Sequence, residues 1–193
     1  MTRESDIDRS VIVDVHSGLG NQMFQFAAGL GLARRNGCGL LVHRLETRGR
    51  TFLLDRFAID LHFAPPGHVK WSGIRHYARR LNLIRPTVFW ERTHAFDDQL
   101  SKLKPPVWIH GYFQSELYFI DIADEIRQSF VLKSRLSPRA TEMAQAIDRT
   151  ALPVSIHVRR GDYMTGADDS IHFALDIDYY RRATALVAAL LGR

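Results

Sequence analysis

A β-branched run that ends in a glycine-containing loop, followed at once by a helical pattern, most limits how this chain can fold. Residues 11–15 (VIVDV) are typical of a strand, and residues 17–20 (SGLG) of a turn that glycine makes easy. From Asn21 onward the apolar side chains recur at helical spacing, until Gly37 follows two arginines as a helix stop. This order predicts one strand–loop–helix unit of a layered α/β fold.

Further strands and helices alternate along the chain. We expect strands at residues 39–43, 87–90, 107–110 and 154–158, the last of them buried, and helices at 71–83, 115–131, 138–148 and 179–191. Ser115, Ser137 and either Asp176 or Asp178 are the expected helix N-caps. The alternation predicts α/β layering with largely parallel strand pairing, and a domain boundary near residues 149–153.

Composition and charge limit the function classes. The 26 Lys and Arg residues exceed the 21 Asp and Glu residues by five, which favours anionic partners such as nucleotides, nucleic acid or anionic lipid. Cys38 is the only cysteine, so there is no intramolecular disulfide and a reducing compartment fits best. No apolar run approaches the roughly 20 residues that cross a bilayer, and residues 1–10 do not resemble a signal peptide. We expect a cytoplasmic protein whose basic surface could rest peripherally on an anionic membrane.

Two adjacent arginines follow the strand expected at residues 154–158. Arg159 and Arg160 stand directly before Gly161 and Asp162. Ligands of open parallel sheets bind beyond the carboxyl ends of the strands, and a guanidinium group clasps phosphate oxygens in a bidentate way. The spacing therefore suits a nucleotide diphosphate. Ion pairs with Asp162, or an exposed turn without a binding role, would explain the same residues.

Three segments together resemble one enzyme family. Residues 157–163 (HVRRGDY) resemble the arginine signature of the α-1,2-fucosyltransferases, which form glycosyltransferase family 11. Residues 18–27 (GLGNQMFQFA) resemble the amino-terminal motif of that family, and residues 111–119 (GYFQSELYF) resemble its central segment. Because the three segments occur in the family's order and span nearly the whole chain, the chain is identified as a member of the bacterial type.

The resemblance implies a fold and a reaction. The implied architecture is GT-B-like, with a Rossmann-type, acceptor-side α/β lobe in residues 1–150 and the beginning of a GDP-sugar-binding α/β lobe in residues 151–193. The implied reaction transfers fucose from GDP-fucose to the 2-hydroxyl of a terminal β-galactoside, with inversion, in a surface glycan such as lipopolysaccharide. We expect no metal or other cofactor, because arginines would stabilise the charge that develops on the departing GDP.

The resemblance also implies roles for the residues of the arginine segment. Arg159 is expected to bind the β-phosphate, while Arg160 and Gly161 help to hold the loop or the nucleotide. His157 is expected to contact donor or acceptor, or else to pack beside its strand. Asp162 is one candidate for the proton acceptor that inverting transfer needs, although an ion pair with a neighbouring arginine is favoured over a catalytic role.

The remaining candidates lie in the other two motifs. Gly20, Asn21 and Gln22 begin a helix and could face substrate, although Asn21 could instead be the helix N-cap. Gln114 and Glu116 follow another expected strand and could reach the same cleft. Glu116 is the second candidate proton acceptor.

The family pattern continues beyond the point at which this sequence stops. We therefore expect a fragment, a truncated product, or a chain whose donor lobe a second copy or a partner completes, and weak GDP binding by these 193 residues. A noncatalytic binding module on the same scaffold is the alternative function. Nucleic-acid binding is not expected, because the basic residues at 75–80 are accompanied by no recognition-helix, zinc-finger or RNA-binding motif.

Overall fold

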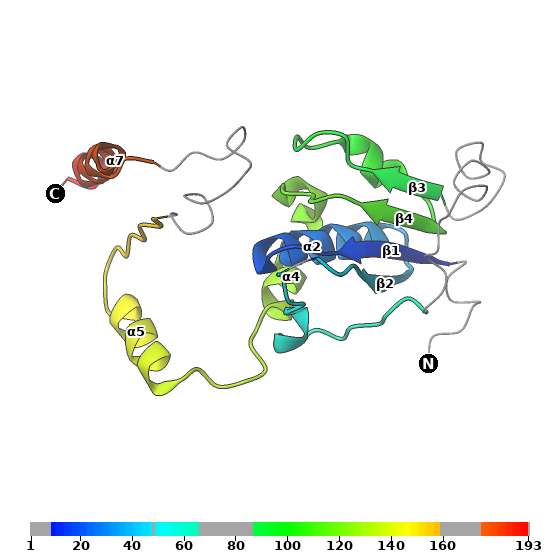
Figure 1. Ribbon diagram of the computed structural model, residues 1–193, viewed down its shortest axis with the longest axis horizontal. Helices are drawn as coiled ribbons and strands as arrows, with labels where there is room; N and C mark the ends of the chain where they lie inside the picture. The colour runs from blue at the N-terminus through cyan, green and yellow to red at the C-terminus, as the bar shows by residue number, and fades with distance from the viewer. Residues whose placement is uncertain (1–8, 48, 66–86, 159–174, 193) are drawn as a thin grey trace. The chain divides into compact units, whose positions relative to one another are not determined.

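A computed structural model describes residues 9–47, 49–65, 87–158 and 175–192 (Figure 1). The chain divides into two compact units, Met1–Arg135 and Leu136–Arg193. The helix expected at residues 71–83 lies outside the described residues, as do Arg159, Arg160, Gly161 and Asp162. The domain boundary expected between residues 150 and 151 stays a prediction.

A four-stranded parallel sheet forms the centre of the first unit (Figure 1). Its strands are β1 (Ser10–Val15), β2 (Gly39–Arg44), β3 (Thr87–Trp90) and β4 (Val107–His110), in the spatial order β2-β1-β4-β3. Every neighbouring pair is parallel. The four strands expected in this part of the chain are confirmed, and so are the α/β class and the parallel pairing. All four carboxyl ends consequently meet at one edge of the sheet, where ligands of such sheets bind.

Helix α2 (Leu19–Arg35) connects β1 to β2 and packs on one face of the sheet. Alternate residues of a strand face the same side, so Val11, Val13 and Val15 all enter the core that α2 helps to form. The helix is buried along most of its length, from Gln22 to Ala33. It begins two residues earlier than expected and ends before Gly37, whose φ of 58° is in the left-handed region that favours glycine.

Gly31 of α2 lies where no side chain fits. A Cβ built on it would come within 2.5 Å of the carbonyl oxygen of Tyr118 and within 3.2 Å of the backbone of Phe119. Gly31→Ala should therefore lower the free energy of unfolding by about 1–3 kcal/mol, because backbone has to move. Gly20→Ala in the same helix meets nothing within 4 Å and should be neutral or stabilising. Urea unfolding of the two variants checks the prediction, and equal stabilities would contradict it.

The chain after β4 turns in short pieces instead of the single helix expected at residues 115–131. The pieces are the 3₁₀ helices η3 (Glu116–Tyr118) and η4 (Ile120–Ile122) and the α-helix α4 (Ala123–Ser129). Ser115 does act as an N-cap, since its side chain accepts a hydrogen bond from the N–H of Leu117. The helical path is interrupted at Phe119, whose φ of −144° and ψ of 19° are not helical, and the preceding carbonyl, of Tyr118, accepts a hydrogen bond of 2.8 Å from Arg35 of α2.

The second unit contains the helices α5 (Pro138–Asp148) and α7 (Ile177–Leu190), close to the expected bounds. Ser137 caps α5 by accepting from the N–H of Ala140, and Asp176 caps α7 by accepting from the N–H of Tyr179 at 2.7 Å. Neither helix has a buried residue. No helix in the described part of the chain is long and apolar enough to cross a membrane.

The buried strand expected at residues 154–158 is wrong. These residues are irregular, and Val154, Ile156 and Val158 are all more than half exposed. An isolated β-branched segment gains nothing from its strand propensity, because a strand needs a neighbour for its backbone hydrogen bonds and a layer to cover its apolar face. No strand among the described residues pairs with it.

Candidate active site

Ser17 determines the conformation of the loop between β1 and α2. This residue has a φ of 66°, an uncommon conformation for a residue other than glycine. Its N–H donates to Oγ1 of Thr47 at 3.2 Å, and its carbonyl accepts from Nε2 of Gln22 at 2.8 Å. Gly18 is the helix N-cap, and neither Gly18 nor Gly20 has any atom within 4 Å of the place a Cβ would take. The glycines leave free space in front of the loop, while Ser17 makes the turn.

Gln22 ties this loop to the segment after β2. Its side chain is 2% exposed, and Nε2 donates to the carbonyls of Ser17 and Thr51, both at 2.8 Å. Oε1 accepts from the N–H of Leu53 at 2.9 Å. All three of these hydrogen bonds join the Gln22 side chain to backbone groups of the protein. Gln22 therefore holds the loop in its conformation. Substrate contact by Gln22 stays a prediction.

The amino-terminal and central motifs meet at this edge of the sheet. Nε2 of Gln114 donates to Oδ1 of Asn21 across 2.6 Å, although 93 residues separate them. Asn21 lies in the first turn of α2 and does not cap it, because the cap is Gly18. Glu116 is exposed in η3, immediately after Ser115. The structure thus brings together the site residues expected from two motifs, and their binding roles stay predictions.

Two polar side chains, the buried Gln25 and the partly buried Glu91, fix the loops after β1, β3 and β4. Oε1 of Gln25 accepts from the N–H of His16 at 2.9 Å, and its Nε2 donates to the carbonyl of Gly111 at 3.0 Å. The carboxylate of Glu91 accepts from the N–H of Tyr112 at 2.6 Å and from that of Phe113 at 3.1 Å. A Cβ at Gly111 would lie 2.4 Å from Cβ of Glu91, so only glycine fits there. These contacts make the carboxyl edge a preorganised surface.

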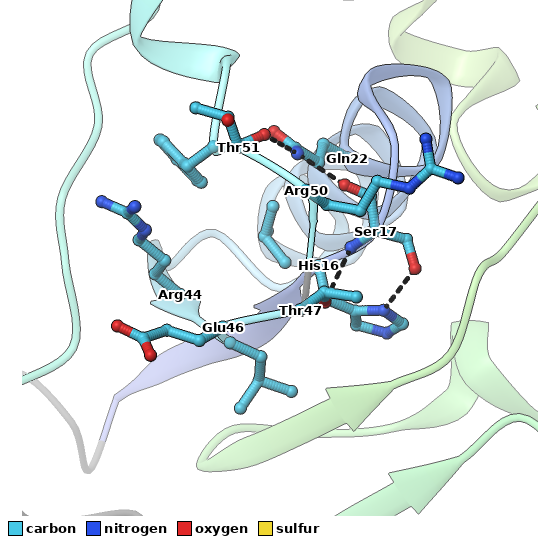
Figure 2. A pocket seen from close by; sticks show the side chains of 11 residues that line it. His16, Ser17, Gln22, Arg44, Glu46, Thr47, Arg50 and Thr51 are labelled. Carbon is cyan, nitrogen blue, oxygen red and sulfur yellow. Dashed lines mark hydrogen bonds between the residues drawn. The ribbon is translucent and has the colours of Figure 1, made fainter.

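A polar pocket of about 420 Å³ opens beside the first loop (Figure 2). Figure 2 shows hydroxyl, amide, carboxylate and guanidinium groups around it, from His16, Ser17, Gln22, Arg44, Glu46, Thr47, Arg50 and Thr51. The guanidinium of Arg44 lies 5.3 Å from the ring centre of Phe52, which holds it in place. Donors and acceptors placed so densely suit a polyhydroxylated ligand.

A row of four side chains crosses the sheet, and none of the four is among the candidates expected from the sequence. The strand register pairs Asp14 with His43, and Trp90 with His110. Val13 pairs with Ile109, so the next residues of these two strands, Asp14 and His110, are also neighbours. We call His43, Asp14, His110 and Trp90 the cross-strand row. It lies on the face opposite α2, next to the apolar cluster of Ile12, Leu41 and Trp108. The alternation in VIVDVH, with polar residues at every second position, was the available signal.

Asp14 is the buried centre of this row, only 7% exposed. Its Oδ2 lies 2.7 Å from Nδ1 of His110, and its Oδ1 lies 2.6 Å from Nδ1 of His43 and 2.8 Å from Nε1 of Trp108. Burial would raise the pKa of Asp14, but the hydrogen bonds from His110, His43 and Trp108 outweigh it and lower that pKa. Asp14 is therefore an ionised acceptor, and both histidines carry a proton on Nδ1.

His16 extends the row beyond the end of β1. Its ring stacks on that of His110 with centroids 5.3 Å apart and lies 5.2 Å from that of Tyr112. Among the described residues, its Nε2 is the one buried side-chain polar atom without a hydrogen-bond partner. Burial lowers the pKa of His16, repulsion from His110 when that ring is protonated lowers it further, and Asp14 partly opposes them. His16 is accordingly a neutral packing ring behind His110.

The lowered pKa of His16 makes stability depend on pH. The unfolded chain takes up this proton near the ordinary histidine value of 6.5, whereas the folded chain takes it up only at lower pH. The free energy of unfolding should therefore fall as the pH drops below 6.5 toward the folded pKa. His16→Gln should make the decrease between about pH 7.5 and about pH 5.5 shallower.

Urea unfolding at those two pH values measures this effect. His62→Gln, at an exposed histidine beside Asp60, is the matched control and should keep the wild-type decrease. A His16→Gln variant with an unchanged decrease would contradict the assignment of His16 as a neutral, buried ring.

The described residues contain only the first two members of the arginine segment, His157 and Val158. His157 is exposed, in the irregular stretch after α5. Arg159, Arg160, Gly161 and Asp162 lie outside the part of the chain that the structure describes, so their roles stay predictions.

Comparisons with known proteins agree on one family. The family model described as glycosyl transferase family 11 matches residues 4–189. An alpha-1,2-colitosyltransferase of Escherichia coli is 28% identical in an alignment of 183 positions that covers 88% of this chain and 61% of that protein. The O-antigen biosynthesis glycosyltransferase WbnK of Escherichia coli is 27% identical in an alignment of 206 positions that covers 91% of this chain and 67% of that protein.

The matches cover most of this chain but a smaller share of its relatives. No solved structure matches the chain. The chain spans 61% of the length of the colitosyltransferase, although almost all of its own length is matched by the family model. The resemblance found in its three motifs is thereby confirmed: the chain belongs to glycosyl transferase family 11.

Proposed function

We propose that this chain provides the acceptor side and the phosphate-binding arginines of a galactoside α-1,2-fucosyltransferase. The reaction is the transfer of fucose from GDP-fucose to the 2-hydroxyl of a terminal β-galactoside in a surface glycan, with inversion at the sugar carbon. Membership of glycosyl transferase family 11 supports a transferase that uses a sugar-nucleotide donor and a glycan acceptor.

The observation that carries the proposal is the meeting of two motifs at the carboxyl edge of the sheet. Asn21 and Gln114 touch there, and the pocket lined by Gln22 and Ser17 opens beside them. Ligands of parallel α/β sheets bind at this edge. Its loops are fixed by one buried and one partly buried hydrogen bond, so little conformational entropy is lost when a substrate binds.

The donor is held by residues of the arginine segment in this proposal. Arg159 binds the β-phosphate, and Arg160 and Gly161 hold the nucleotide loop, so that fixed positive charge stabilises the departing GDP without a metal ion. Asp162 or Glu116 accepts the proton of the attacking hydroxyl, and His157 contacts donor or acceptor.

The relatives bear on the choice of sugar and acceptor. One is named for the transfer of colitose in an α-1,2 linkage and another for O-antigen biosynthesis. The first name fits the proposed 1,2 linkage, and the second fits a lipopolysaccharide acceptor. They also make a colitose donor the strongest competitor of GDP-fucose in this chain.

Acceptor-dependent release of GDP tests the proposal. The protein is incubated with millimolar GDP-fucose or a GDP-activated colitose, each with and without lactose as the β-galactoside. We expect GDP to appear only when donor and lactose are both present, and faster with GDP-fucose. Faster release of GDP from the colitose donor would show that the transferred sugar is colitose and not fucose.

The competing function is a noncatalytic binding module built on the same α/β scaffold. A cooperative thermal melt shows that the assayed protein is folded. If folded protein releases no GDP with either donor, the transferase proposal fails and the binding module is retained.

A further inference from the structure

The exposed end of the cross-strand row has the chemistry of a sugar-binding surface. We propose that Trp90 and His110 bind the galactose ring of the acceptor glycan, with the ring stacked on the indole and one of its hydroxyls bound to Nε2 of His110. The proposal rests on the proposed function for its choice of sugar, but its geometry is independent of the donor.

The Nδ1 atom of His110 is bound to Asp14, and its Nε2 atom points away from that carboxylate. Because Nδ1 donates to the ionised carboxylate of Asp14 at 2.7 Å, the neutral ring leaves Nε2 as an acceptor. Nε2 makes no hydrogen bond to the described residues, and the side chain is 28% exposed. It is therefore open to a ligand hydroxyl, which can donate to the neutral ring or accept from the protonated one.

The ring of His110 cannot easily turn away from this position. His16 stacks against it with the two planes 19° apart, and Trp90 lies with its ring centre 4.3 Å from that of His110. Asp14 is itself fixed by His43 and Trp108. Asp14 is thus a positioning residue, which sets both the tautomer and the direction of His110.

Trp90 supplies an aromatic face at the same place. It is the last residue of the edge strand β3, it pairs in register with His110, and it is 55% exposed. Large aromatic residues are ordinarily buried more deeply than this, and an indole bears partial negative charge on its face. The apolar C–H groups of a pyranose, which carry partial positive charge, pack well on such a face.

Galactose fits this combination better than a ligand of another class. The hydrogens on C3, C4 and C5 lie on one face of a β-galactoside, and hydroxyl groups surround that face. The face can cover Trp90 while a hydroxyl at its rim reaches Nε2 of His110. A purely apolar ligand would leave His110 unused, and a phosphate would meet the negative face of the indole and the nearby Asp14 carboxylate.

Saturation-transfer NMR with millimolar lactose, in the absence of nucleotide, tests the site. We expect the strongest transfer at H3, H4 and H5 of the galactose ring, and roughly tenfold weaker binding for Trp90→Ala. Phe96→Ala removes another exposed aromatic ring of the β3–β4 connection and should bind lactose as the wild type does. No transfer to lactose, or equal binding by Trp90→Ala and the wild type, would overturn the proposal.

The positioning role of Asp14 has a spectroscopic readout. In a long-range ¹H–¹⁵N spectrum at neutral pH, we expect the proton of the neutral His110 ring on Nδ1 in the wild type and a shift toward Nε2 in Asp14→Asn. His110→Gln, which lacks the ring but leaves Asp14 in place, should bind lactose more weakly while remaining folded. If the His110 tautomer is unchanged in Asp14→Asn, Asp14 does not position the His110 ring.

These results separate the acceptor site from the transferase proposal. Lactose binding that depends on Trp90, together with no release of GDP, would retain the site and reject the transferase. GDP release, together with lactose binding that is the same in Trp90→Ala and the wild type, would retain the transferase and reject the site.

Discussion

Replacing Arg159 by alanine is expected to lower kcat/KM for the GDP-sugar by about 100- to 1000-fold, the largest effect anticipated for any single substitution. The proposed interaction is made with charge that grows on the β-phosphate as the glycosidic bond to GDP breaks, so its loss should act mainly on kcat. Arg159→Lys keeps the charge but loses the planar fork, and should recover only part of the rate.

Initial rates of GDP release over a range of donor concentrations provide the measurement. Arg127→Lys is the matched control, because Arg127 is exposed in α4 and, within the described part of the chain, forms its ion pair with Asp124 three residues earlier. We expect its rates to equal those of the wild type. An Arg159→Ala variant with wild-type kcat/KM would reject Arg159 as the phosphate ligand.

The second large effect is expected on stability, from the removal of Asp14. Asp14→Ala should lower the free energy of unfolding by about 3–5 kcal/mol, because an ionised acceptor for three donors disappears from a nearly dry position. The lowered pKa of Asp14 adds a pH dependence. Its stabilisation is present above the unfolded value of 3.8 and is lost as the pH falls through the lower folded pKa.

Urea unfolding at neutral pH, followed by circular dichroism, measures the loss. Asp98→Ala is the control, since Asp98 is an exposed carboxylate that pairs with Lys102 on one 3₁₀ helix, and it should leave the midpoint unchanged. Equal midpoints for Asp14→Ala and the wild type would show that the carboxylate does not organise the sheet edge.

Local patterns predicted the first unit well because its elements are specified locally. The Val-rich run before the glycine loop, the helical spacing from Asn21 and the short β-branched runs at residues 87–90 and 107–110 each place a strand or helix correctly. Side-chain caps were readable for the same reason: Ser137 and Asp176 cap the helices expected of them, whereas Ser115 caps the short 3₁₀ helix η3 and not the long helix expected there. Parallel pairing followed from the alternation of strands and helices.

The cross-strand row could not be predicted in this way, because it depends on register. Asp14, His110 and Trp90 are far apart in the sequence and become neighbours only when β1, β4 and β3 align. The turn at Ser17 was missed for a related reason, since its left-handed conformation is stabilised by Thr47 and Gln22 and not by its own residue type.

The error at residues 154–158 shows the limit of strand propensity. Alternating Val and Ile residues favour an extended, half-buried strand only where another strand and a covering layer are present. Here Ile156 is 59% exposed, and in the described residues no strand lies beside it. The donor lobe expected from the resemblance therefore stays a prediction.

The linkage in the product of the transfer reaction tests the account most directly. Lactose and GDP-fucose are incubated with the protein, and the purified trisaccharide is examined by two-dimensional NMR. We predict an α-linked fucose on O2 of galactose, which identifies the donor, the acceptor hydroxyl and the inversion together. A fucose on another hydroxyl, a β linkage, or no trisaccharide from folded protein would contradict the account.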